Sequence, residues 1–421
     1  MMQPDWTHMT RVFGRIGLLS FGGPAAQIAL MHDALVSREK WLSEAQYLRA
    51  LSLCMLLPGP EAMQLATYAG WRLRGVAGGL LAGLLFVVPG ACVIFGLAIG
   101  YVHFGDLPLV RAAFLGIKAT VIVVVLQALL RLGTKALKGP AAWMLAGLAF
   151  VALFAFGVPF PLIVIAAGVY GYLATPAQTP ATPDAPQHTN TPRTIAIWGA
   201  IWGAIWASPV ALLWITDQTF LLEVALFFSR LAVVTFGGAY AVLAYMTQTV
   251  VQEFGWISTG QMIDALGLAE TTPGPLILVT QFVALLAGYA QGGPGMAIVA
   301  GGVALWVTFT PCFLWIFAAG PYLDQIAARP RLAAALRAIT AAVVGVILNL
   351  SVWFALHVLF ARIATAPGLA LPIPDLGTLD LWALILTGVA GALMLGTRLS
   401  LLPVLALMAA LGCAISLTGL T

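Results

Sequence analysis

The sequence has 421 residues, of which 61% are hydrophobic and only 8% are charged, and its mean hydropathy is +1.00. This composition excludes a soluble globular protein and predicts a polytopic membrane protein whose surroundings are the lipid bilayer. The net charge of +4 does not indicate nucleic acid as a partner, because the Lys and Arg residues are scattered at the ends of apolar segments. Topology signals of membrane proteins lie at such ends.

The first half of the chain opens with two broken apolar segments. The first is interrupted at Phe21-Gly22-Gly23-Pro24 and the second at Pro58-Gly59-Pro60, with a charged loop at 32–49 between them. Four unbroken apolar runs follow, and the longer ones match the roughly 20 residues that a spanning helix needs. These runs lie at about 76–103, 108–131, 141–157 and 159–174.

The middle of the chain separates two similar halves. Residues 175–193 are rich in Pro and Thr and have little apolar content, which is typical of a linker. One isolated apolar span follows at 194–216, and then the pattern of the first half starts again. The predicted organisation is an N-terminal transporter repeat at 1–174, the linker, a connecting transmembrane helix, and a C-terminal repeat at 217–421.

The repeat is visible at a fixed offset of 215 residues. At this offset 18 of the 48 positions from 13 to 60 carry the same residue, whereas roughly three or four are expected by chance. Arg15 matches Arg230, for example, and Pro58 matches Pro273. The two halves are therefore expected to be structural copies.

Charge then predicts how the two copies lie in the membrane. The loop between the broken segments carries Arg38, Lys40 and Arg49 in the first half, whereas its copy has Glu253, Gly255 and Asp264 at the same positions. Because cytoplasmic loops favour Lys and Arg, the equivalent loops should face opposite sides. The predicted fold class is an all-α polytopic membrane protein with two inverted-topology repeats. Whether each broken segment is a re-entrant hairpin or a full crossing stays open.

The broken segments are the leading candidates for a substrate-binding site. An interrupted helix is tolerated in a membrane only where it is buried in protein or lines a wet cavity. The helix that starts after each break offers free N–H groups and a positive dipole end to an anion. Kinks for close helix packing are the competing interpretation, but four breaks in register favour a site. Its predicted residues are Phe21, Gly22, Gly23, Pro24, Pro58, Gly59, Pro60, Gly237, Gly238, Pro273, Gly274 and Pro275.

Four polar side chains join this list as candidate substrate ligands. Arg15 and Arg230 are equivalent cations ahead of a break, and each is either functional or a topology anchor. Lys118 lies inside an apolar span, where it either binds an anion or extends toward the nearer surface. Gln64 is placed to hydrogen-bond an oxyanion or a neighbouring helix.

Signs of catalysis are missing from the sequence. It has no Ser-His-Asp order, HExxH motif or nucleotide-binding signature, and the four cysteines lack metal-ligand spacing. We therefore predict no catalytic residue, no metal and no cofactor, and we do not expect an enzyme. Glu61 and Glu270 flank the breaks, where a carboxylate either carries a proton or forms a salt bridge; a structural role is favoured.

At the broken segments the sequence resembles the chromate ion transporter family in its long two-domain form. The resemblance rests on SFGGP at 20–24, LLPGPEAMQLATYAGW at 56–71, TFGGAYAVL at 235–243 and AETTPGPLILVTQFVALLAG at 269–288. It implies export of chromate, a tetrahedral dianion similar to sulfate, and hence chromate resistance. Ala239 stands where the first half has Pro24, and apolar residues at 276–279 replace 61–64, so the two halves should contribute unequally.

The resulting expectation is a secondary transporter of the inner (cytoplasmic) membrane that exports chromate by alternating access. An inside-negative potential favours outward movement of a dianion by about 4.6 kcal/mol per 100 mV, so no nucleotide site is required. A carrier for sulfate or another tetrahedral oxyanion is the alternative. The coupling ion and the existence of a homodimer are left open.

Overall fold

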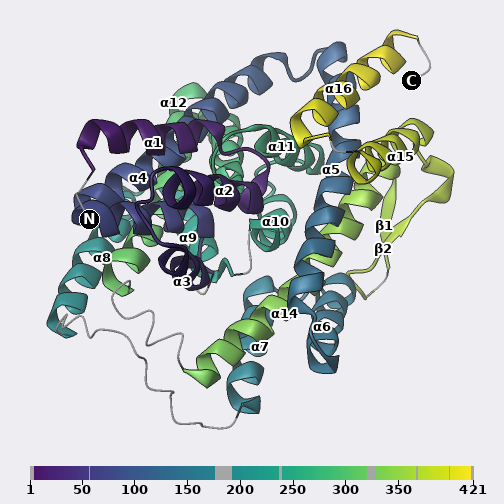
Figure 1. Ribbon diagram of the computed structural model, residues 1–421. Coiled ribbons are helices and arrows are strands. Elements are labelled where there is room, and N and C mark those ends of the chain that lie inside the picture. Colours follow the sequence, from purple (N-terminus) through teal and green to yellow (C-terminus); the bar gives the residue numbers. More distant parts are fainter. Residues whose placement is uncertain are drawn as a thin grey trace. The chain divides into compact units, whose positions relative to one another are not determined.

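The computed structural model describes residues 4–55, 57–175, 192–236, 239–319, 329–366, 368–397 and 399–418. Helices dominate this part of the chain, and the one sheet within it is a two-stranded hairpin (Figure 1). The predicted all-α class is confirmed. The helices form two compact units, and each unit takes segments from both halves of the sequence. The repeats seen in the sequence and the compact units therefore divide the chain differently.

Unit 1 comprises Met1–Gly96, Tyr172–Ala239 and Thr272–Ala334. Its elements from the first half are α1 (Trp6–Leu19), α2 (Gly23–His32), the π-helical turn η1 (Asp33–Arg38), α3 (Glu44–Cys54) and most of α4 (Glu61–Phe104). Its elements from the second half are α8 (Pro192–Ile215), α9 (Thr219–Val234), η3 (Leu276–Leu278), α12 (Val279–Leu314) and η4 (Trp315–Ala319).

Unit 2 comprises Leu97–Gly171, Tyr240–Thr271 and Ala335–Thr421. It holds α5 (Pro108–Ala136), α6 (Pro140–Phe156), most of α7 (Phe160–Ala174), α10 (Ala239–Thr247), the π-helical turn η2 (Gln248–Glu253) and α11 (Thr259–Thr271). Most of α14 (Pro330–Leu359) follows, then the strands β1 (Ile363–Thr365) and β2 (Pro372–Pro374), the turn η6 (Leu376–Thr378), α15 (Leu381–Gly396) and α16 (Leu401–Leu417). The sequence did not predict the hairpin of β1 and β2.

Five helical stretches of the described chain are long and apolar enough to cross a membrane. They are Glu61–Phe104, Pro108–Ala136, Ala196–Ile215, Leu276–Ala318 and Pro330–Leu359. Four shorter apolar helices accompany them: α6, α7, α15 and α16. Two helices next to the predicted breaks are shorter still: α2 has 10 residues and α3 has 11, well below the roughly 20 that a span requires.

Local structure recurs between the two halves. α1 and α9 end 215 residues apart, at Leu19 and Val234, and η1 and η2 begin at the same offset. A capping box formed by Ser43 and Gln46 has its counterpart in the reciprocal hydrogen bonds of Ser258 and Gln261. The two halves thus share a local plan, while their inversion in the membrane stays a prediction.

The same kink interrupts the long helices that follow. α4 bends at Arg74 (φ −143°, ψ 33°) and Gly75 (φ 61°, ψ −156°), and α12 bends at Gly292 (φ −157°, ψ 23°) and Gly293 (φ 70°, ψ −159°). A glycine takes the positive φ in both places because it lacks a Cβ that would clash.

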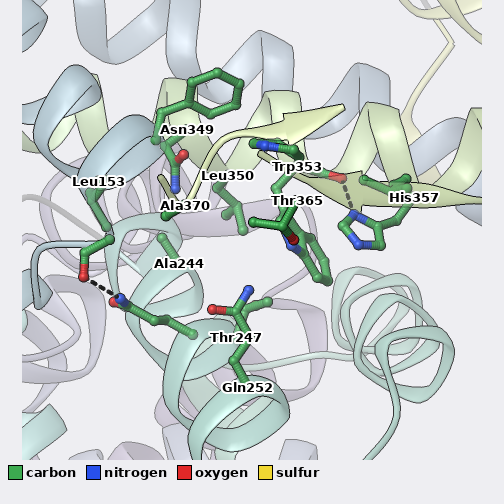
Figure 2. A pocket seen from close by; sticks show the side chains of 15 residues that line it. Leu153, Ala244, Thr247, Gln252, Asn349, Leu350, Trp353, His357, Thr365 and Ala370 are labelled. Carbon is green, nitrogen blue, oxygen red and sulfur yellow. Dashed lines mark hydrogen bonds between the residues drawn. The ribbon is translucent and has the colours of Figure 1, made fainter. Parts of the chain in front are cut away.

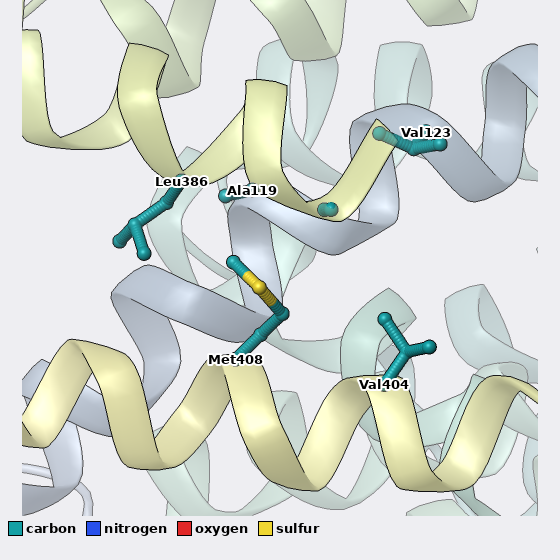
Figure 3. Packing of buried hydrophobic residues seen from close by; sticks show 6 residues of the cluster. Ala119, Val123, Leu386, Val404 and Met408 are labelled. Carbon is teal, nitrogen blue, oxygen red and sulfur yellow. The ribbon is translucent and has the colours of Figure 1, made fainter. Parts of the chain in front are cut away.

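Small residues allow close helix packing in unit 2. α15 and α16 lie against α5 around a core of Ala119, Val123, Leu386, Ala390, Val404 and Met408 (Figure 3). A Cβ atom at Gly116 would lie 1.8 Å from the Met408 carbonyl oxygen, and one at Gly412 would lie 2.2 Å from that of Ala112. Glycine at these two positions therefore brings the backbones of α5 and α16 together, as is common in membrane proteins.

Tryptophans hold α8 against α12 in unit 1. The indole N–H of Trp206 donates to the carbonyl oxygen of Val307 at 3.1 Å, and that of Trp306 donates to Ile205 at 2.9 Å. The connecting helix predicted at 194–216 is therefore packed into unit 1 by hydrogen bonds in both directions.

Candidate functional site

Four breaks interrupt the helices, and their described residues all belong to unit 1; we number them in chain order. The first break is 20–24, the second 57–60, the third 235–238 and the fourth 272–275. Gly237 and Gly238, predicted site residues of the third break, lie outside the described residues. In the other three breaks, the predicted residues Gly23 and Pro24 begin α2. The remaining predicted residues lie between helix ends; they are Phe21, Gly22, Pro58, Gly59, Pro60, Pro273, Gly274 and Pro275.

The first and third breaks end their helices in the same way. The Ser20 hydroxyl donates to the Ile16 carbonyl oxygen at 2.6 Å, and the Thr235 hydroxyl donates to Leu231 at 2.6 Å. Both side chains are fully buried. Each hydroxyl thereby satisfies a carbonyl oxygen in the last turn of its helix that the helix itself leaves without a partner.

Backbone hydrogen bonds cross between the two halves of the sequence. The Gly59 N–H of the second break donates to the Thr235 carbonyl oxygen of the third break at 2.9 Å. In the equivalent positions, the Gly274 N–H of the fourth break donates to Ser20 of the first break, also at 2.9 Å. Each half therefore satisfies the broken backbone of the other half.

Glycine is needed at both donor positions. The φ angles of Gly59 and Gly274 are +112° and +90°, a region that other residues rarely adopt. A Cβ atom at Gly59 would also lie 2.9 Å from Gln64 Nε2 and 3.0 Å from Cys312 Sγ. The Pro-Gly-Pro spacing thus encodes a backbone shape that points an N–H at the partner break.

Buried glutamine side chains satisfy the remaining carbonyl groups. The amide nitrogen of Gln64 donates to the Pro58 carbonyl oxygen at 2.6 Å, and that of Gln27 donates to Gly274 at 2.6 Å. A carbonyl oxygen only accepts, so these contacts fix which end of each amide carries the N–H groups. The Oε1 atoms of both side chains are buried without a hydrogen-bond partner in the described chain. Each amide therefore supports the broken backbone, and its oxygen is closed off from any ligand in this conformation.

A small cavity of about 10 Å³ lies where the breaks meet. It is lined by Pro24, Gln27, Pro60, Glu61, Ala62, Thr235, Pro275, Leu276 and Ile277, so residues of all four breaks contribute. The helices α2 and α4 begin at this cavity, with Gly23 and Glu61 as their first residues. Its volume is enough for about one water molecule. A tetrahedral oxyanion has five heavy atoms and needs more room than this conformation offers.

The electrostatics of the cavity combine two opposite influences. The N-termini of α2 and α4 contribute partial positive charge and N–H groups, which favour an anion. Glu61, however, is the one acidic or basic side chain among the lining residues of this cavity. An ionised carboxylate at that position opposes binding of a dianion.

The structure does not bring the predicted arginines to this cavity. Arg15 on α1 and Arg230 on α9 both have exposed side chains. Arg15 lines a different cavity of about 100 Å³, which Asp33 and Arg38 also line. Arg38 there forms an ion pair with Asp33 at 2.7 Å. The exposed positions of the two arginines leave their predicted role as ligands without support from the geometry.

Lys118 lies in unit 2 and has a partner there. Its Nζ atom is 3.1 Å from Asp264 Oδ1, and the Tyr101 hydroxyl donates to Asp264 Oδ2 at 2.8 Å. The side chain of Asp264 is 9% exposed and that of Lys118 is 26% exposed. The pair of Lys118 and Asp264 could not be predicted from the sequence, because α5 and α11 are far apart along the chain.

A second buried carboxylate of unit 2 was assigned a structural role from the sequence. Glu270 lies near the end of α11 and is only 5% exposed. Its Oε1 atom accepts a hydrogen bond from the Tyr240 hydroxyl at 2.7 Å. The structural role of Glu270 stays a prediction.

Comparison with known proteins identifies the family. A family model described as "Chromate transporter" matches residues 7–172 and 222–414, which is most of the chain. The chain belongs to the chromate transporter family. The resemblance of the break motifs is thereby confirmed, and family membership together with the five long apolar helices makes the chain a multi-pass membrane protein.

Curated relatives of the chromate transporter family match over most of their length. A "Chromate transport protein" from Pseudomonas aeruginosa is 35% identical over 340 residues, covering 80% of this chain and 77% of the relative. A "Probable chromate transport protein" from Synechococcus elongatus is 30% identical over 341 residues, covering 80% and 82%. These relatives are transport proteins, as expected here, and not enzymes. No solved structure matches the chain.

A half-length relative adds a point about organisation. The "Uncharacterized transporter YwrA" from Bacillus subtilis is 31% identical over 163 residues, which covers 38% of this chain but 91% of the relative. A relative of this chain is thus about as long as one of the predicted repeats.

Proposed function

We propose that this protein is a secondary transporter that exports chromate across the cytoplasmic membrane and thereby confers chromate resistance. The observation that carries the proposal is the meeting of all four breaks around one cavity in unit 1. Relatives that cover most of the chain and are named chromate transport proteins support the choice of substrate.

The chemistry of the breaks suits a tetrahedral dianion. The first turns of α2 and α4 leave backbone N–H groups unused by their helices, and these groups bind oxyanions without a full positive charge. Glu61 has to be protonated or move away while the dianion is bound, because two negative charges in a small cavity repel each other. Binding without a fixed lysine or arginine also leaves the anion free to depart.

Transport requires the cavity to open, since it now holds about one water molecule. The crossed hydrogen bonds of Gly59 with Thr235 and of Gly274 with Ser20 close the cavity in this conformation. Alternating access then consists of loosening one crossed pair while the other stays intact, which exposes the site to one side at a time. The membrane potential, negative inside, favours release of the dianion outside.

Chromate uptake into inverted membrane vesicles tests this function. We expect uptake to rise when a positive interior is imposed, because export in the cell corresponds to uptake in such vesicles. Gly59→Ala and Gly274→Ala should abolish uptake, since each substitution strains a positive φ by about 1–2 kcal/mol and disturbs a crossed hydrogen bond. Gly96→Ala is the matched control, because Gly96 is an exposed helical residue with nothing within 4 Å of its added Cβ.

Two outcomes would change the proposal. Uptake that is unaffected by both glycine substitutions, at normal protein abundance, would remove the breaks from the transport pathway. Labelled sulfate carried with chromate excluded would keep the site and replace the substrate with the alternative of a sulfate-type oxyanion.

A further inference from the structure

Unit 2 contains a larger cavity that the transport proposal does not use. Its volume is about 190 Å³, and it lies among the turn between α6 and α7, helix α10, the π-helical turn η2, helix α14 and the β1–β2 hairpin. Figure 2 shows Thr247 and Gln252 on one helix and Asn349 and Trp353 on another, with the cavity between them. None of its lining residues belongs to a break.

Two side chains that line this cavity keep only hydrogen-bond acceptors for a ligand. The Thr247 hydroxyl donates to Leu243 at 2.8 Å, so only its lone pairs remain. His357 Nδ1 lies 2.9 Å from the Trp353 carbonyl oxygen, which only accepts. The ring hydrogen of neutral His357 is therefore on Nδ1, and Nε2 is an acceptor.

The lining is polar but carries no formal charge apart from any proton on His357. The described lining residues include no Asp, Glu, Lys or Arg, so they neutralise the charge of neither an anion nor a metal ion. The amides of Asn349 and Gln252 complete it and can both donate and accept. An oxyanion such as chromate has acceptors only, and it would meet acceptors at Thr247 and His357.

One wall of the cavity is flat and apolar. The rings of Trp353 and His357 lie 4.2 Å apart between centroids and are tilted by 32°. Leu153 and Leu350 also line the space. The combination of an apolar wall with fixed acceptors and adaptable amides matches a molecule that has C–H faces and several O–H donors.

We propose that this cavity binds a neutral, hydroxyl-rich group of the size of a small polyol, either free in solution or as part of a lipid headgroup. The ligand donates hydrogen bonds to the Thr247 hydroxyl oxygen and to His357 Nε2, and exchanges hydrogen bonds with Asn349 and Gln252. This site is separate from the chromate pathway, and its existence does not depend on the proposed function.

Binding of myo-inositol to the full chain tests the proposal. The protein is placed in phosphatidylcholine nanodiscs prepared without glycerol or glycoside detergents, and saturation-transfer NMR measures contact of myo-inositol with the protein. We expect a clear transfer signal that falls at least fivefold in Asn349→Leu and in Gln252→Leu. Because Gln252 is exposed, its substitution preserves folding even if Asn349→Leu does not. Gln218→Leu, an exposed glutamine that does not line the cavity, is the control.

A second arm separates the two sources of the ligand. In nanodiscs that contain phosphatidylinositol, a cavity filled by the headgroup lowers the myo-inositol signal, whereas a cavity for a soluble polyol gives the same signal as before; either result supports the site. A signal that is equal in the parent and both cavity variants would overturn the proposal. Displacement of myo-inositol by a tenfold excess of sulfate would overturn it as well, because the cavity would then be an oxyanion site.

Discussion

Lys118 forms an ion pair with a residue that is distant in the sequence. A single lysine inside an apolar span is expected either to bind an anion or to extend toward the surface. Its contact with Asp264 at 3.1 Å gives it a third role, which is to neutralise a buried carboxylate that Tyr101 also binds. An unpartnered buried charge is far more costly than a pair. Removal of one charge should therefore do more damage than removal of both.

Single and double substitutions at this pair test that role. We expect Lys118→Met and Asp264→Asn each to lower the free energy of unfolding by up to about 3 kcal/mol, the low end for a buried pair because Lys118 is partly exposed. The double variant should lose much less than the sum of the two. Chemical unfolding in lipid nanodiscs measures all three.

Two outcomes are informative beyond stability. Strictly additive losses of unfolding free energy would show that Lys118 and Asp264 do not stabilise the protein through each other. A stable double variant that no longer transports chromate would restore Lys118 as a substrate ligand.

Residue types that break helices were the most predictive part of the sequence. Gly59 and Gly274 stood out because glycine between prolines inside an apolar segment has few structural explanations. The sequence could not reveal that the Gln64 amide donates a hydrogen bond to Pro58, because the direction of a side-chain amide depends on local geometry. It also missed the acceptor-lined cavity at Gln248 and Asn349, since isolated amides carry no pattern.

At the scale of elements, helix ends followed from local signals, whereas helix partners did not. α5 begins at Pro108 and α6 begins at Pro140, and proline at a helix start is a signal that a sequence shows directly. The close contact of α5 with α16 depends on Gly116 and Gly412, which are separated by most of the chain. Nothing local marks these two glycines among the 44 in the sequence.

Substitution of Gly116 tests the contact between α5 and α16. A Cβ atom there would lie 1.8 Å from a backbone oxygen of Met408, and backbone cannot move aside as easily as a side chain. We expect Gly116→Ala to destabilise the protein by about 1–3 kcal/mol, as is typical of overpacking. Thermal unfolding in nanodiscs measures the effect.

Gly388 on α15 offers the matched control within unit 2, because its added Cβ meets nothing within 4 Å. Gly388→Ala should be neutral, or should stabilise its helix slightly because alanine is the better helix former. Equal effects of the two substitutions would mean that the contact of α5 with α16 is not a tight one in the membrane.

At the scale of the whole molecule, the repeats are visible in the sequence but the compact units are not. The offset of 215 residues correctly paired the π-helical turns η1 and η2. Unit 1 nevertheless draws on both halves, because the second and third breaks are joined by one hydrogen bond and the first and fourth by another. Hydrogen bonds between the two copies cannot be detected by comparing the sequence of one copy with the sequence of the other.

Labelling of introduced cysteines tests the predicted inversion. Ser37 in η1 and Glu253 in η2 are both exposed, and they belong to the equivalent loops that are predicted to face opposite sides. In a variant without the four native cysteines, we expect a membrane-impermeant maleimide added to intact cells to modify Glu253→Cys but not Ser37→Cys. Inverted vesicles should give the reverse pattern. Labelling of both positions from the same side would contradict inverted repeats.

The crossed hydrogen bonds also bear on how such a protein is assembled. A single half of this chain ends its second break with a glycine N–H whose acceptor belongs to the other half. A polypeptide that consisted of this half alone would have to obtain that acceptor from a second molecule. Joining both halves in one chain replaces this encounter with an internal one, at an effective concentration in the millimolar range for a short flexible connection. Fusion of two halves thus makes completion of the cavity independent of how much protein the membrane contains.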